Sequence, residues 1–166
     1  MHAPARRTFA VGAVGILLAT GTGPANAATP PRSGCSAAQA SALVRRFVQA
    51  FDRGDLSTLN QVWGSKLWFQ WYGVTSDPGR RDQPEAGRRD TLLRYFATRH
   101  AAHEQLTLIS LKLNGISNGN RNFEYRLLRG ADDLLEGPVP YLGKGALSCV
   151  TGRLIVWTMG PDPTRP

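Results

Sequence analysis

The sequence of 166 residues contains few cysteines and lysines, and beyond its first 27 residues it has no apolar run that could cross a bilayer as a helix. The two cysteines, Cys35 and Cys149, lie too far apart for a CxxC redox pair. Arginine outnumbers lysine 17 to 3, a bias that a GC-rich coding sequence produces without selection for anion binding. The sequence also lacks an internal repeat and any intact catalytic motif. These absences exclude a CxxC redox enzyme and a repeat architecture.

The first 27 residues have the features of a cleavable export signal. Arg6-Arg7 precedes the mostly apolar residues 9–20, and Pro24-Ala25-Asn26-Ala27 supplies the small residues that signal peptidase requires. We predict cleavage after Ala27 and a location that is secreted or on the cell-envelope (periplasmic) side. Because Arg6-Arg7 is followed by Thr8-Phe9, the signal resembles a twin-arginine signal, and the twin-arginine and general secretion routes both stay open.

The exported part is predicted to be a single domain over residues 36–160, with a flexible stub at 28–35 and a tail at 161–166. All 12 acidic residues and 18 of the 20 basic residues lie beyond residue 27, which gives the mature chain a net charge of +6. An exported protein rarely meets nucleic acid, so we expect no nucleic-acid partner. Export and an even cysteine count favour a Cys35–Cys149 disulfide, which would remove about 4–5 kcal/mol of unfolded-state entropy.

Capping residues and apolar spacing predict two helices at the start of this domain. Ser36 with Gln39 forms a capping box, and the apolar residues that follow at helical spacing continue to a stop at Gly54. Asp55 is the predicted cap of a shorter second helix that ends at Gly64.

A polar stretch and a third helix come next. Residues 75–89 are predicted to be a loop whose basic pairs, Arg80-Arg81 and Arg88-Arg89, are either solvated or in contact with anionic lipid or a cell-wall polymer. Asp90 is predicted to cap the third helix. Its apolar stripe is expected to run through Leu92, Leu93, Phe96, His100 and His103.

Strands are predicted wherever the apolar period changes to two. The segment Leu67–Tyr72 precedes the third helix, and four strands follow it: Leu106–Leu113, Asn122–Leu128, Ala146–Val150 and Arg153–Met159. Turns are expected at Asn114-Gly115, Asn118-Gly119 and Thr151-Gly152, and a long connector over residues 130–145. Helices followed by a run of antiparallel strands define an α+β class.

The segment Phe47–Leu56, with Leu59 and the passage from Trp63 to Trp71, resembles the opening of the nuclear transport factor 2-like superfamily. This superfamily includes ketosteroid isomerases and SnoaL-like polyketide cyclases. The resemblance covers about residues 36–160. It implies a cone-shaped, curved antiparallel sheet wrapped around three helices, with a pocket between the sheet and the helices.

The isomerase chemistry of that superfamily does not carry over to this sequence. When the isomerase pattern is aligned without gaps from Gly54-Asp55-Leu56, its oxyanion-binding tyrosine falls on Phe47 and its proton-abstracting aspartate on Trp71. Enolisation needs a base near the proton and a donor near the developing oxyanion, and neither residue supplies one.

Three ionisable residues remain as catalytic candidates: His100, Glu124 and Tyr125. His100 is either a general base on the apolar stripe or a histidine satisfied at the helix end. Together, His100, His103 and Glu104 are spaced like metal ligands but lack a further ligand, so we expect no metal and no cofactor. If Phe123 and Tyr125 face the pocket, Glu124 lies outside it, paired with an arginine such as Arg126; the reverse parity makes Glu124 a candidate base.

Two functional hypotheses follow from the sequence. The first is an exported small-molecule-binding or interaction domain without an intact catalytic set, whose apolar pocket is lined by Phe47, Trp71, Phe96, His100, Tyr125 and Trp157. The second is a SnoaL-like cyclase, dehydratase or hydrolase that uses His100 as general base. The expected partner is a hydrophobic small molecule, and a homodimer through the open sheet face is a third, weaker interpretation.

Overall fold

The computed structural model describes residues 35–71, 73–74, 81–82, 85–134 and 137–164. The predicted export signal and most of the stub therefore lie outside the described residues. The elements in chain order are α1 (Ala37–Asp52), α2 (Leu56–Val62), β1 (Trp63–Trp71), β2 (Gly73–Val74), β3 (Arg81–Asp82), β4 (Glu85–Arg88), α3 (Arg89–Ala101), β5 (Gln105–Ser117), β6 (Asn120–Gly130), β7 (Val139–Ser148) and β8 (Arg153–Pro161). Among the described residues, no helix is both long and apolar enough to cross a membrane.

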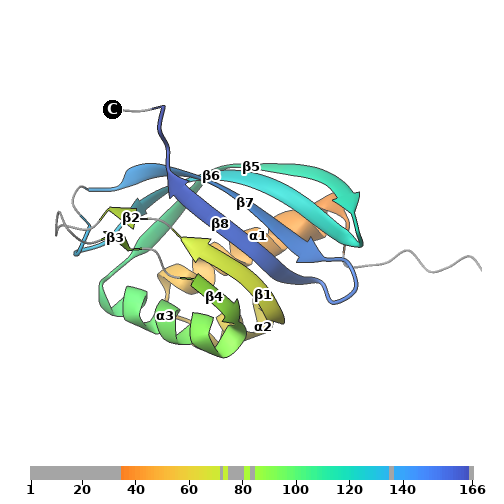
Figure 1. Ribbon diagram of the computed structural model, residues 1–166, viewed down its shortest axis with the longest axis horizontal. Helices are drawn as coiled ribbons and strands as arrows, with labels where there is room; N and C mark the ends of the chain where they lie inside the picture. Colours follow the sequence, from red (N-terminus) through yellow and green to blue (C-terminus); the bar gives the residue numbers. More distant parts are fainter. Residues whose placement is uncertain (1–34, 72, 75–80, 83–84, 135–136, 165–166) are drawn as a thin grey trace, which may run out of the picture.

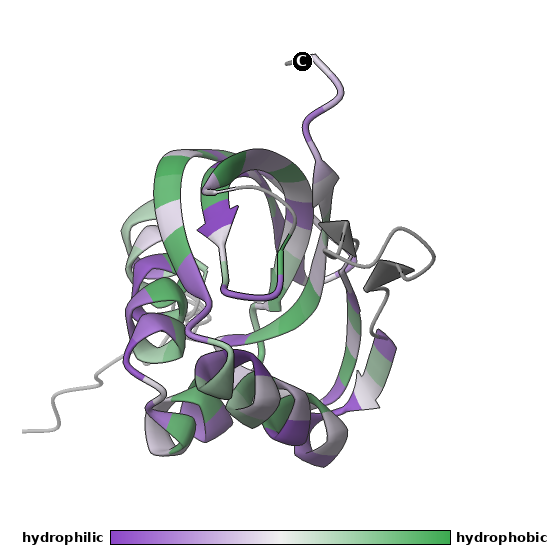
Figure 2. Ribbon diagram, turned by 90° about the vertical axis from the view of Figure 1, so that its left-hand side faces the viewer, coloured by the Kyte–Doolittle hydropathy of each residue, from purple (hydrophilic) through white to green (hydrophobic). Residues whose placement is uncertain are grey.

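One six-stranded sheet, in the order β4-β1-β8-β7-β6-β5, forms the body of the molecule. It curls over the helices, as the two perpendicular ribbon views show (Figures 1 and 2). The α+β class and the curved sheet around three helices are thus confirmed. The sheet is mixed rather than fully antiparallel. Strands β1 and β8 pair in parallel, whereas the other neighbouring strands of this sheet pair antiparallel.

The first two helices form where capping and periodicity place them. The Ser36 side chain accepts a hydrogen bond from the Gln39 backbone N–H, and the Gln39 side chain accepts one from the Ser36 backbone N–H. Gly54 ends α1 in the left-handed region at φ +64°. Asp55 then caps α2 by accepting a hydrogen bond from the Thr58 backbone N–H at 2.9 Å.

The start of the third helix differs from the prediction. Helix α3 begins at Arg89, its N-cap is Arg88, and Arg88 provides no side-chain capping bond. Asp90 lies in the first turn and pairs with Arg88 instead of capping. The helix starts directly at the end of β4, the strand at one edge of the sheet, so residues 85–88 are a strand and not part of a loop.

Strand β7 occupies much of the segment that we predicted to be a connector. It starts at Val139 and contains Gly143 and Gly145. A Cβ atom on Gly143 would lie 2.2 Å from Tyr125 Cζ, and one on Gly145 would lie 2.2 Å from Phe123 Cζ. These glycines therefore serve the packing of aromatic rings on the neighbouring strand, and the glycine content that suggested a connector is part of the sheet.

The predicted turn at Asn114-Gly115 is also wrong. Strand β5 continues to Ser117, with an irregularity in its pairing between Leu113 and Ile116. This is a bulge, which bends a strand without ending it. The Asn114 carbonyl accepts a hydrogen bond from Arg121 Nη1 at 3.0 Å across the hairpin.

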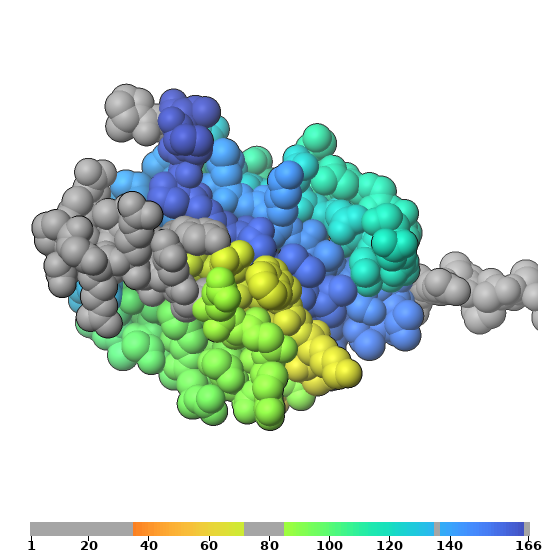
Figure 3. Space-filling view, in the orientation of Figure 1, coloured from red at the N-terminus to blue at the C-terminus, as the bar shows by residue number. Residues whose placement is uncertain are grey.

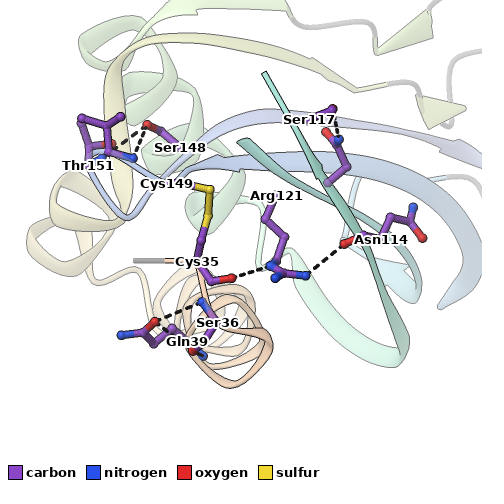
Figure 4. Close-up of a disulfide and its surroundings, with 11 residues drawn as sticks. Cys35, Ser36, Gln39, Asn114, Ser117, Arg121, Ser148, Cys149 and Thr151 are labelled. Carbon is purple, nitrogen blue, oxygen red and sulfur yellow. Dashed lines mark hydrogen bonds between the residues drawn. A yellow bond between two sulfur atoms is a disulfide. The ribbon is translucent and has the colours of Figure 1, made fainter. Parts of the chain in front are cut away.

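The disulfide between Cys35 and Cys149 is confirmed, with Cα atoms 4.9 Å apart. It joins Cys35, which precedes the N-cap Ser36 of α1, to the turn between β7 and β8 (Figure 4). Arg121 Nε donates a hydrogen bond to the Cys35 carbonyl at 2.6 Å, so β6 is bonded to the same residue that forms the disulfide. The helix that covers the concave side of the sheet is therefore fastened to the sheet at its N-terminal end.

Candidate functional site

The residues predicted to line a pocket, apart from His100, form the aromatic core itself. Each of these side chains is at most 3% exposed: Phe47, Trp71, Phe96, Tyr125 and Trp157. The ring centroids of Phe47 and Trp157 lie 4.6 Å apart, and those of Tyr125 and Trp157 lie 4.1 Å apart. We call this set, with Phe51, Trp63, Phe69, Tyr95 and Phe123, the aromatic interior. Its rings occupy the space between sheet and helices where the resemblance implied a pocket.

Three indole groups in the aromatic interior lack an acceptor. The Nε1 atoms of Trp63, Trp71 and Trp157 are buried and have no hydrogen-bond partner among the described residues. All three side chains are fully buried. A buried donor without a partner costs roughly 1–3 kcal/mol, and native proteins contain few such groups. Three such donors therefore lie within the aromatic interior.

His100 lies outside this interior. Its side chain is exposed, and its ring lies so close to Gly54 that a Cβ there would be 2.4 Å from His100 Nε2. The buried stripe of α3 is Leu92, Phe96 and Arg99 instead, which is an i, i+4, i+7 pattern. The prediction that His100 continues the apolar stripe and lines a pocket is therefore wrong.

The three residues with metal-like spacing point in different directions. His103 Nδ1 lies 2.7 Å from Asp132 Oδ2 at the surface, whereas the Glu104 side chain is completely buried. His103 adopts a left-handed backbone conformation with φ 50°, which turns the chain between α3 and β5. Within the described residues, no three histidine, cysteine or acidic side chains are grouped to hold a metal ion.

Glu104 belongs to a buried network of ion pairs, which we call the charged cluster: Arg99, Glu104, Arg129 and Asp133. Arg129 Nε donates to Glu104 Oε1 at 2.7 Å, and Arg99 Nε donates to Glu104 Oε2. The Arg99 guanidinium also donates to both carboxylate oxygens of Asp133, each at 2.7 Å. Arg99, Glu104 and Arg129 are buried, while the Asp133 side chain is 48% exposed.

The charged cluster and the aromatic interior are in direct contact. The guanidinium carbon of Arg129 lies 4.8 Å from the ring centroid of Trp71 and 5.3 Å from that of Tyr141. Burial alone would lower the pKa of Arg129, but its hydrogen bonds and ion pair with Glu104 outweigh burial and raise it. The hydrogen bond from Arg99 holds the pKa of Asp133 below its usual value. The two guanidinium groups and two carboxylates of the charged cluster carry formal charges that cancel.

The charged cluster is not among the predicted site residues, although its signals are present in the sequence. Arg99 lies seven residues after Leu92 on the buried stripe of α3. Arg129 shares the inward parity of Tyr125 and Leu127 on β6. A charged residue at a core position is almost never buried unless it is paired, so both arginines required buried acidic partners.

The parity of β6 also places the two remaining candidates. Tyr125 points inward, its hydroxyl donates to the Thr158 carbonyl at 3.0 Å, and burial raises its pKa well above the usual value. Glu124 faces outward, 3.7 Å from Lys112 Nζ. Of the two parities that the sequence left open for Glu124, the structure has the outward one, and the partner of Glu124 is Lys112 because Arg126 pairs with Asp162.

Two of the surface hollows are lined by described residues, and one of them reaches Tyr125 of the aromatic interior. One, of about 430 Å³, is on the outer sheet face and is lined by Glu124, Tyr125, Leu142, Gly143, Lys144, Thr158, Met159 and Gly160. The other, of about 340 Å³, is lined by Asn60, Ser65, Arg88, Arg89, Asp90 and Leu93. Figure 3 shows the side of the molecule on which β1 (yellow) and β8 (dark blue) meet above α3 (green). His100 lines neither hollow.

The predicted basic pairs do not form a free patch in the described part of the chain. Arg80 lies outside the described residues, and Arg81 belongs to strand β3. Arg88 pairs with Asp90, while Arg89 Nη1 donates to the carbonyls of Asn60 at 3.3 Å and Trp63 at 3.2 Å. Arg89 thus joins the start of α3 to the end of α2.

Comparison with solved structures defines the class of fold. An uncharacterised protein with a cystatin-like fold from Caulobacter vibrioides matches with a TM-score of 0.61 and 12% identity over 75% of this chain and 87% of that one. A dehydratase assigned to the NTF2-like family in Streptomyces avermitilis matches with a TM-score of 0.55 and 16% identity over 75% of this chain and 94% of that one. This chain therefore has the nuclear transport factor 2-like, or cystatin-like, fold.

A third neighbour is known with its ligand. The orange carotenoid protein from Anabaena (Nostoc) sp. PCC 7120, which binds canthaxanthin, matches with a TM-score of 0.59 and 11% identity. The match covers 73% of this chain and 37% of that one, so it concerns only part of the carotenoid protein. No protein-family model matches the sequence, and no curated protein does. The likeness to known proteins thus lies in the fold.

Proposed function

We propose that this chain is an exported binding domain for a hydrophobic small molecule that carries a hydrogen-bond acceptor, and that the ligand is held at the aromatic interior. The observation that carries the proposal is the set of unpaired indole N–H groups of Trp63, Trp71 and Trp157. An acceptor on a ligand would pair with one of these donors and recover the free energy lost by leaving it unpaired. Small-molecule sites combine apolar walls with a few such polar groups.

Two further observations support this proposal. The fold is shared with a carotenoid protein whose ligand, canthaxanthin, is a hydrophobic small molecule. The Cys35–Cys149 disulfide is typical of an oxidising compartment, in agreement with the predicted export signal. Because the described rings pack against one another, ligand entry must displace some of them. Trp71 is the favoured point of entry, since it is the last residue of β1 and contacts the charged cluster.

The alternative enzyme, with His100 as general base, receives no support from the geometry. A general base must reach the proton that it removes directly or through one water. His100 is exposed beside Gly54 and away from the aromatic interior. Tyr125 is buried with a raised pKa and already donates to Thr158, so it cannot act as a base near neutral pH.

Uptake of a neutral probe tests the proposal. Methyl 1-pyrenebutyrate has an apolar ring system and an ester carbonyl that accepts hydrogen bonds, and its binding can be followed by the loss of tryptophan emission. We expect wild type to bind the probe and Trp71→Phe to bind it about two- to ten-fold more weakly, since one hydrogen bond is lost. Trp68→Phe is the matched control because Trp68 is 53% exposed, and it should bind like wild type.

Organic extraction of the purified exported protein, followed by mass spectrometry, provides the second measurement. The proposal predicts that a hydrophobic compound co-purifies with the protein or that the protein takes up the probe. If the extract is empty and wild type does not bind the probe, the chain is not a small-molecule-binding domain.

A further inference from the structure

The charged cluster contains one ion pair that differs from the others. Glu104 is completely buried and receives hydrogen bonds from both Arg99 and Arg129. Asp133, in contrast, is 48% exposed and contacts the cluster only through Arg99. Of the two carboxylates, Asp133 is therefore the one that solvent reaches and that another group can replace without dismantling the buried pairs.

The donors of Arg99 make the position of Asp133 suitable for an anion. Arg99 Nε donates to Glu104, whereas Arg99 Nη1 and Nη2 donate to Asp133. If Asp133 moves away, Nη1 and Nη2 of the buried Arg99 side chain lose the carboxylate that accepts their hydrogen bonds. A buried charge without full compensation is costly, so an anion from outside would bind in its place.

The geometry of Arg99 specifies the kind of anion. Its Nη1 and Nη2 atoms each donate to a different oxygen of the Asp133 carboxylate at 2.7 Å. This parallel pair of bonds matches the planar shape and spacing of a carboxylate. The group bound at present is itself a carboxylate, so a ligand carboxylate fits the same donors.

The same position adjoins the aromatic interior. Tyr95 lies one helical turn before Arg99 on α3, and its ring centroid is 6.0 Å from that of Trp71. The Trp71 ring in turn contacts the Arg129 guanidinium at 4.8 Å. A ligand with its polar end on Arg99 would therefore direct its apolar body towards the aromatic interior.

We infer that the ligand is a hydrophobic carboxylic acid whose carboxylate takes the place of the Asp133 carboxylate on Arg99. This inference rests on the proposed function and adds the chemical class of the ligand. In the free protein, Asp133 competes with the ligand for Arg99. Removal of the Asp133 side chain should strengthen binding of the acid and leave binding of a neutral analogue unchanged.

A pair of matched probes tests the inference: 1-pyrenebutyrate and its methyl ester, which share the apolar body and differ in the charge of the head group. For Asp133→Ala we expect the acid to bind at least about ten-fold more tightly than the ester, as charge-assisted hydrogen bonds imply. The ratio of the Kd of the ester to the Kd of the acid should be smaller for wild type. Asp132→Ala is the matched control, because Asp132 lies in the same segment but pairs with the exposed His103, and its ratio should equal that of wild type.

The possible results separate the inference from the function on which it rests. If Asp133→Ala binds the acid and the ester equally, or if its ratio equals that of Asp132→Ala, the carboxylate inference is wrong while small-molecule binding stands. If neither probe binds any of the three proteins, the proposed function fails and the inference fails with it. Circular dichroism of each variant verifies that it is folded, which is expected because both substitutions lie at exposed side chains.

Discussion

At the scale of single residues, the buried carboxylate of Glu104 is the most demanding feature of this chain. It is completely buried and lies between the guanidinium groups of Arg99 and Arg129. A buried ion pair contributes little compared with a well-packed apolar group, but loss of one partner leaves the others without compensation. The charged cluster therefore depends most strongly on Glu104, because its buried carboxylate pairs with both arginines.

Glu104→Gln should lower the free energy of unfolding by about 3–5 kcal/mol, because it removes the buried carboxylate that pairs with both Arg99 and Arg129. The matched control is Glu124→Gln, which removes an exposed carboxylate 3.7 Å from Lys112 and should change stability by no more than about 1 kcal/mol. Urea unfolding of the two variants and wild type gives both values. Equal losses in the two variants would contradict the dependence of the fold on the charged cluster.

At the scale of elements, β7 shows how the sheet makes room for the aromatic interior. Gly143 and Gly145 lie opposite Tyr125 and Phe123 in the register of β6 and β7. The rings of these two residues lie where Cβ atoms of β7 would otherwise be. The absence of side chains at Gly143 and Gly145 thus leaves the space that the rings of Tyr125 and Phe123 occupy.

Gly143→Ala should destabilise the protein by about 1–3 kcal/mol or more, since the added methyl group would overlap the Tyr125 ring and approach the Thr158 carbonyl. Gly115→Ala in β5 is the control, because a Cβ there meets nothing within 4 Å, and its stability should stay within about 0.5 kcal/mol of wild type. Thermal unfolding under identical conditions compares the two. If Gly143→Ala is as stable as wild type, the Tyr125 ring does not depend on the absence of a Cβ atom at position 143.

The elements also show what the sequence could and could not predict. Local signals sufficed for α1 and α2, where the Ser36 capping box, Gly54 and Asp55 act on neighbouring residues. The start of β7 was missed because its glycines are explained only by rings on another strand. For the candidate site, the sequence pointed to aromatic residues that the structure buries, but their rings fill the space in which a pocket was expected. The burial of Arg99 was not predicted, because it depends on Glu104 and Asp133, whose positions no local pattern specifies.

At the scale of the whole molecule, the curved sheet and α1 enclose a core composed mainly of aromatic rings. The disulfide ties the start of α1 to the turn after β7, and the charged cluster holds the end of α3 to β6. Between these two attachments lies the aromatic interior with its unpaired indole groups. In the proposed function, a bound ligand accepts a hydrogen bond from one of these indole groups.

The most direct test of this central claim is a ¹H–¹⁵N spectrum of the indole N–H groups during titration with methyl 1-pyrenebutyrate. The chain has four tryptophans, and each signal can be assigned from its Trp→Phe variant. We predict that the probe moves at least one of the signals of Trp63, Trp71 and Trp157 to lower field, as expected when an N–H gains an acceptor, while the Trp68 signal stays in place. If the probe moves the Trp68 signal alone, or moves none of the four, the claim that the aromatic interior receives the ligand is contradicted.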